Sequence, residues 1–67
     1  MKNRLLLILD YYIEKAYSYA SVNDQTMTTY EKGRIEAILV VLLMEFNITE
    51  NELSEKSKYL LNIINNL

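Results

Sequence analysis

An uninterrupted apolar run, residues 37–44, occupies the middle of a 67-residue chain that contains no proline and only one glycine. A membrane-spanning helix needs about 20 apolar residues, and Glu45 ends this run after eight. The run is therefore too short to cross a bilayer, and we expect it to form part of a helix in water. On a helical wheel, one face of this helix carries Ile35, Ile38, Leu39, Leu42 and Phe46, and nearly the opposite face carries Gly33, Ala37, Val40, Val41 and Met44.

A helix that is apolar on both faces has to be covered on both faces. Two companion helices of similar length cannot wrap it completely, so something else must cover the second face. Gly33 and Ala37 are four residues apart, a spacing of small residues that lets another backbone approach closely. We therefore expect a homodimer through the surface formed by Gly33, Ala37, Val40, Val41 and Met44. The alternative is a monomer whose outer valines stay partly exposed, since much of any protein surface is apolar.

The length and composition point to one small folded domain that benefits from self-association. A chain of this size buries only about 60% of the surface that its unfolded form exposes, and the sequence has no Cys and no His, which excludes disulfides and the usual zinc ligands. It is 51% hydrophobic with a formal net charge of −2, too apolar for a disordered tail and too acidic for general attraction to nucleic acid. The N-terminal apolar run, residues 5–9, is shorter than the core of a signal peptide. We expect a cytoplasmic protein without membrane association.

Three helices account for nearly all of the single domain 1–67: about residues 3–20, 29–46 and 50–66. The first has an apolar face at helical spacing, made by Leu5, Leu9, Ile13, Ala16 and Ala20. The sequence thus predicts an all-α fold, a helical hairpin followed by a third helix.

Two capping signals set the expected starts of the second and third helices. Thr28 precedes Glu31 by three residues, the spacing of a capping box, and Thr49 precedes Glu52 in the same way. At the second site Ile48 and Leu53 also have the spacing of a hydrophobic staple. The third helix then has a narrow apolar seam at Leu53, Ser57, Leu60, Ile64 and Leu67.

A second candidate surface lies on the first helix. Leu7 and Tyr11 are apolar or aromatic residues among polar ones, four residues apart, and Tyr17 also falls outside the core face. Tyrosine is enriched in protein interfaces because its ring is apolar and its tip is polar. We expect a partner-binding surface of Leu7, Asp10, Tyr11, Glu14 and Tyr17, whose acidic character would suit a basic partner such as the nucleic-acid channel of a host enzyme.

The junction LLMEFNITENEL resembles a helix-turn-helix, with Asn47 at the turn where glycine is more common. This resemblance implies a small DNA-binding regulator whose third helix reads bases. However, the start of that helix carries Glu50, Glu52 and Glu55 and no basic residue, so it would repel the phosphate backbone.

No catalytic constellation is evident. Asp10 and Glu14 are one helical turn apart and could in principle present paired carboxylates, but a solvated helix face explains them better. A di-metal bundle uses Glu together with His, and His is absent. We expect no enzymatic activity, no cofactor, no metal and no small-molecule substrate.

The sequence therefore predicts a small, dimeric, non-enzymatic protein-interaction module. Its size and its AT-rich type of composition, rich in Asn, Ile, Lys and Tyr, would suit an accessory or inhibitory protein of a phage or mobile element that binds a host macromolecule. Two alternatives stay open: a helix-turn-helix transcriptional regulator, and a structural subunit of a larger complex. The partner's identity is not encoded in any motif.

Overall fold

The computed structural model describes residues 1–66, except for the side chain of Glu50. Within them the chain forms three α-helices and no strand: α1 (Lys2–Ser21), α2 (Gln25–Phe46) and α3 (Glu55–Asn65), with a single-turn 3-10 helix, η1 (Glu50–Glu52), before α3. The predicted all-helical, three-helix fold is confirmed. Leu67, assigned by its spacing to the seam of the third helix, lies outside the described residues.

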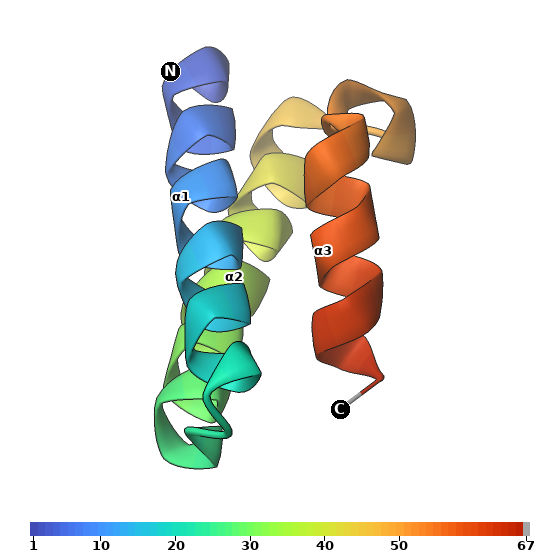
Figure 1. Ribbon diagram of the computed structural model, residues 1–67. Coiled ribbons are helices and arrows are strands. Elements are labelled where there is room, and N and C mark those ends of the chain that lie inside the picture. Colours follow the sequence, from blue (N-terminus) through green and yellow to red (C-terminus); the bar gives the residue numbers. More distant parts are fainter. Residues whose placement is uncertain (67) are drawn as a thin grey trace.

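Helix α1 is the central element, because it packs against both α2 and α3, whereas the backbones of α2 and α3 scarcely approach each other. In Figure 1, α1 and α2 form an antiparallel pair and α3 stands beside them. Leu9, Ile13 and Ala16 of α1 are completely buried at the helical spacing that the sequence predicted. The core consists of Leu9, Ile13, Ala16, Ile35, Leu42, Ile48, Leu60 and Ile64.

Helix α2 begins four residues before its predicted start at Thr29. Asp24 is the N-cap, and its carboxylate accepts a hydrogen bond from Met27 N–H at 3.1 Å. Asn23 turns the chain in the left-handed region, with φ 59°. The predicted capping box therefore does not form: Thr28 lies inside the helix and donates its hydroxyl to Asp24 C=O, and Glu31 is buried. Residues 22–24 thus join α1 to α2 in a tight turn, a shorter connection than the predicted helix bounds of about 20 and 29 implied.

Helix α2 ends at Phe46, as predicted, and Asn47 follows in the left-handed conformation with φ 51°. Helix α3 does not start at Glu50. Glu52 does accept a hydrogen bond from Thr49 N–H at 3.1 Å, one half of the predicted box, but this closes only η1. Ser54 caps α3 instead, accepting from Ser57 N–H at 3.1 Å. The later start leaves Leu53 packed on the core from outside the helix.

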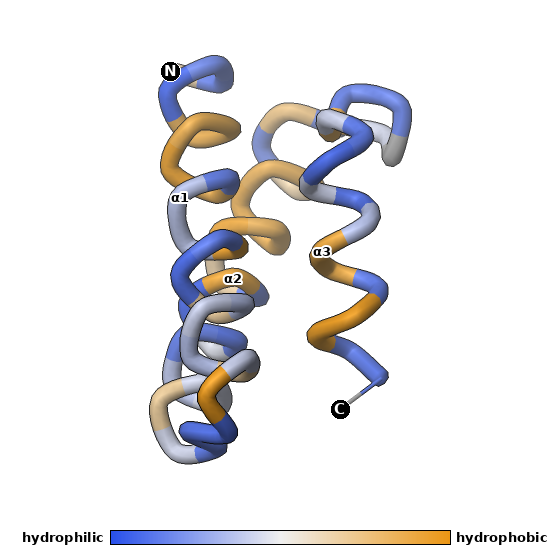
Figure 2. The backbone as a smooth tube through the Cα atoms, viewed as in Figure 1, coloured by the Kyte–Doolittle hydropathy of each residue, from blue (hydrophilic) through white to orange (hydrophobic). Residues whose placement is uncertain are grey.

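Hydrophobic residues are concentrated in the half of α2 that leads into the turn at Asn47 (Figure 2). Some of these residues, such as Leu42, are buried in the core, whereas others, such as Val40 and Met44, are exposed. No helix in the described chain is long and apolar enough to span a membrane.

Candidate interaction surfaces

The outer surface of α2, defined as Gly33, Ala37, Val40, Val41 and Met44, is exposed at every position. Met44 keeps 73% of its accessible surface and Val40 keeps 52%. A Cβ atom built on Gly33 would meet nothing within 4 Å, so the helix backbone itself is open there. Leu43, which the sequence analysis did not include, lies exposed beside them. These residues make an apolar strip on a helix whose opposite face forms the core.

The acidic residues proposed for partner binding on α1 are engaged within the chain. Asp10 accepts a hydrogen bond from the Ser57 hydroxyl of α3. Glu14 forms an ion pair with Lys56 of α3, and this contact raises the pKa of Lys56 above its ordinary value. Both carboxylates therefore help to hold α3 against α1.

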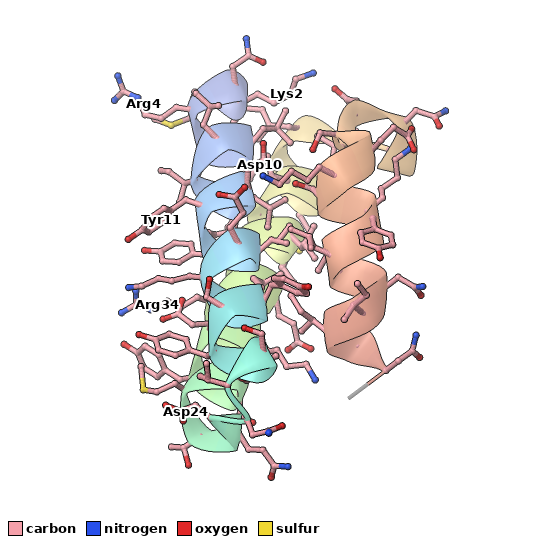
Figure 3. All side chains as sticks on the ribbon, in the orientation of Figure 1. Lys2, Arg4, Asp10, Tyr11, Asp24 and Arg34 are labelled. Atoms are coloured by element: carbon pink, nitrogen blue, oxygen red, sulfur yellow. The ribbon has the colours of Figure 1, made fainter. Side chains whose placement is uncertain are left out.

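The other three residues of that proposed surface, Leu7, Tyr11 and Tyr17, are exposed. The Tyr11 side chain projects away from α3, on the same side as Arg4 and Arg34 (Figure 3). The structure thus divides the predicted set: its two acids contact α3, and Tyr11 belongs to a different group of side chains.

That group is a connected set of three tyrosine rings and two cations, which we name the cation–tyrosine surface: Tyr11, Tyr12, Lys15, Tyr30 and Arg34. Lys15 Nζ lies 5.6 Å from the centre of the Tyr11 ring, which is itself 5.5 Å from the Tyr12 ring. The Arg34 guanidinium lies 5.2 Å from the Tyr12 ring and 4.6 Å from the Tyr30 ring. Cations above aromatic faces at such distances attract the ring quadrupole.

Arg34 joins the two helices of the pair, since Tyr12 is on α1 and Tyr30 is on α2. It also donates a hydrogen bond to the Tyr30 hydroxyl, which raises the pKa of Arg34 above its ordinary value. Sequence reasoning missed this cluster. The four-residue spacings of Tyr11 with Lys15 and of Tyr30 with Arg34 were a visible signal, but the contact between Arg34 and Tyr12 depends on how α1 packs on α2.

A hollow of about 190 Å³ lies between α2 and α3, with Ile35 and Ile64 among its apolar lining and Lys32 and Glu36 among its polar lining. Ligand pockets usually have volumes of about 300–1,000 Å³. The described residues also contain no group of three or more His, Cys, Asp or Glu that could hold a metal ion. Neither observation supplies a constellation for chemistry.

Glu31 is an anomaly on the inner face of α2. Its side chain is 1% exposed, and its Oε2 atom has no hydrogen-bond partner in the described part of the chain. A buried carboxylate without a partner is costly. Glu31 does not line the hollow between α2 and α3, but its charge contributes to raising the pKa of Arg34, after the larger effect of Tyr30.

Comparisons of the sequence with protein-family models and curated proteins, and of the fold with solved structures, gave no significant match.

Proposed function

We propose that the protein is a non-enzymatic protein-interaction module that forms a homodimer through the outer surface of α2. The observation that carries the proposal is the exposure of Val40, Val41, Leu43 and Met44 on a helix whose other face already forms the core. Contiguous apolar patches of this kind are uncommon on monomers and often mark interfaces.

The accessible surface supports this reading. The isolated chain exposes 4765 Å², whereas a folded monomer of 7.9 kDa typically exposes about 4,400 Å². A standard interface buries about 800 Å² per partner. Helix α2 has 22 residues and is therefore about 33 Å long, so two copies can pack along several helical turns.

The pattern along the strip favours an antiparallel dimer. Exposed residues at Thr26, Tyr30, Gly33, Ala37, Val40 and Met44 alternate by four and three, as in a coiled-coil seam. In an antiparallel pair with a two-fold axis level with Ile35, Gly33 of one copy faces Ala37 of the other. Tyr30 then faces Val40, and Thr26 faces Met44. Small residues meet at the centre and larger ones meet smaller ones toward the ends, the self-complementarity that an isologous interface requires.

Light scattering across a dilution series tests the dimer. We expect a wild-type dimer and a folded monomer for the double variant Val40→Glu plus Met44→Lys. Leu7→Glu is the matched control, since it changes an exposed leucine of α1 and should leave the mass unchanged. A wild-type monomer at all concentrations would refute the dimer and favour the structural-subunit alternative, in which a different protein covers this face.

Cysteine cross-linking tests the orientation, because the sequence has no Cys to interfere. In the antiparallel pair, two copies of position 26 are about 27 Å apart, far beyond the 7 Å limit between the Cα atoms of a disulfide. Thr26→Cys alone should therefore not cross-link, whereas a mixture of Thr26→Cys and Met44→Cys proteins should. Efficient cross-linking of Thr26→Cys with itself would indicate a parallel dimer instead.

The proposal includes a cytoplasmic accessory or inhibitory role in a phage or mobile element, supported by the small size and by the absence of Cys. The helix-turn-helix alternative has less support, because both lysines of α3, Lys56 and Lys58, are already paired with carboxylates. A DNA-reading helix needs free cations beside the phosphates.

A further inference from the structure

The ion pairs of the described residues are all on one side of the molecule. They are Lys2 with Glu52, Lys56 with Glu14, and Lys58 with Glu55, so each involves the C-terminal segment that begins at η1. The other four cations, Arg4, Lys15, Lys32 and Arg34, form no ion pair within the described residues, and Lys32 lines the hollow between α2 and α3. Arg4 and Arg34 project on the side of the helical pair away from α3 (Figure 3).

Two of these cations, Lys15 and Arg34, differ from the others in lying over tyrosine rings of the α1–α2 pair. Three carboxylates near α3 are paired with lysines, whereas Lys15 and Arg34 contact tyrosine rings and form no ion pair. A cation fixed in this way keeps its charge available to a partner, because a ring quadrupole attracts the cation without neutralising it.

We propose that the cation–tyrosine surface binds an acidic segment of a partner protein, one whose carboxylates are flanked by apolar side chains. Arg34 and Lys15 would pair with the carboxylates, and Arg is the side chain best shaped to bind a carboxylate with two parallel hydrogen bonds. Tyr11, which is 57% exposed, offers apolar ring area and a hydroxyl group beside the cations.

This surface is separate from the proposed dimer contact for most of its extent. Tyr11, Tyr12 and Lys15 are on α1, outside the strip on α2, so they stay accessible in the antiparallel dimer. Tyr30 is at the border, where one side of its ring would face Val40 of the second copy while its hydroxyl still accepts from Arg34. The partner surface does not depend on dimer formation.

A protein segment fits this surface better than nucleic acid does. Nucleic-acid binding is built from several simultaneous phosphate contacts. Here the surface offers two cations, with Arg4 nearby on the same side. Two or three cations match one or two carboxylates of a peptide.

The test is fluorescence anisotropy with a fluorescein-labelled amphipathic helical peptide of Glu, Leu and Ala, compared with the same peptide carrying Lys at every Glu position. We expect the acidic peptide to bind about tenfold more tightly than the basic one, since complementary charge decides specificity. Arg34→Gln and Lys15→Gln should each weaken binding about fivefold or more, by loss of a charge-assisted hydrogen bond.

Lys58→Gln is the matched control, because it removes a cation of α3 and should leave the affinity unchanged. Arg34→Lys is a second variant, which keeps the charge and is expected to bind with intermediate affinity. Circular dichroism checks that each variant is helical.

Equal affinity for both peptides, or wild-type affinity of Arg34→Gln, would overturn the proposal. Preferential binding of a labelled oligothymidylate that the acidic peptide cannot displace would overturn it as well and assign the surface to nucleic acid. Light scattering on the same samples separates these results from a failure of the dimer.

Discussion

Ser57 of α3 donates its hydroxyl to the carboxylate of Asp10 on α1, across 47 residues of sequence. One turn along α1, Glu14 pairs with Lys56, the neighbour of Ser57. Two adjacent residues of α3 thus contact two acids that are one turn apart on α1. Because the backbones of α2 and α3 scarcely approach each other, these polar contacts help the Leu60 and Ile64 side chains of the core to hold α3 in its position.

Ser57→Ala should lower the free energy of unfolding by about 1–2 kcal/mol, because it removes a hydrogen bond at a buried position and leaves the Asp10 carboxylate without this donor. Asp10→Ala should have a similar effect, and the double variant should cost less than the sum, as residues in direct contact do not behave additively. Urea denaturation at one fixed protein concentration measures the free energy of unfolding of the wild type, the two single variants and the double variant. Ser18→Ala, at an exposed position of α1, should change the stability by less than about 0.5 kcal/mol. Strict additivity would show that the bond contributes nothing.

Glu31→Met should stabilise the protein by about 1–3 kcal/mol, because an apolar side chain of similar length replaces a buried carboxylate that has an unpartnered oxygen. Thermal and urea unfolding, followed by circular dichroism, give the difference in the free energy of unfolding between the variant and the wild type. Glu36→Met is the control at an exposed position of the same helix. A loss of stability in Glu31→Met alone would mean that the carboxylate has a favourable partner after all.

Gly33→Ala separates the monomer from the dimer. In the isolated chain nothing lies within 4 Å of the new Cβ, and alanine favours a helix interior over glycine by about 0.5–1 kcal/mol. We therefore expect the variant to be a more stable monomer but to dimerise more weakly, because the added methyl group separates two closely approaching backbones. Unfolding measured at low concentration and light scattering at high concentration report the two effects. Stronger dimerisation would place the crossing point elsewhere on α2.

Asn47 ends α2 with φ 51°, a conformation that glycine adopts without strain. Asn47→Gly should be neutral or stabilise the protein by up to about 1 kcal/mol, and Asn47→Ala should destabilise it by about 1 kcal/mol. Denaturant midpoints of the two variants measure this difference. Asn62→Ala and Asn62→Gly, inside α3, should rank in the opposite order, since glycine is the poorer residue in a helix. The same order at both positions would argue against the left-handed turn.

The pKa of Glu52 is lowered from its ordinary value of 4.5, first by the hydrogen bond from Lys2, at 2.6 Å, and then by Thr49 N–H. A carboxyl group whose pKa is lower in the folded state stabilises the fold above its unfolded pKa, and this contribution is lost as the pH falls through the folded value. Wild-type stability should thus decrease below about pH 4.5, and Glu52→Gln should show a weaker decrease. Glu45→Gln, at an exposed position of α2, should keep the wild-type pH dependence. Urea denaturation at a series of pH values tests this, and identical slopes for all three proteins would contradict it.

Local pattern alone determined a large part of this protein. The helical spacing of Leu9, Ile13 and Ala16, the end of α2 at Phe46 and the left-handed Asn47 follow from side-chain periodicity and backbone preference, which act over a few residues. The double-faced apolar character of α2 was visible in the same way, and so were the exposed candidates Val40 and Met44. Each of these features depends on residues within about two turns of one another.

Only the tertiary structure decided between competing signals. Asp24 and Ser54 cap their helices in place of Thr28 and Thr49, because all four residues are good N-caps and packing of the neighbouring side chains selects one start. The charged residues of α1 show the same effect. Their spacing in the sequence grouped Asp10 and Glu14 with Tyr11 in one surface. In the folded chain both acids contact α3, whereas the Tyr11 ring lies beside Lys15. Arg34 reaches Tyr12 only because α1 and α2 are antiparallel neighbours. Contacts between residues distant in sequence depend on the relative placement of whole helices, and no local pattern specifies that placement.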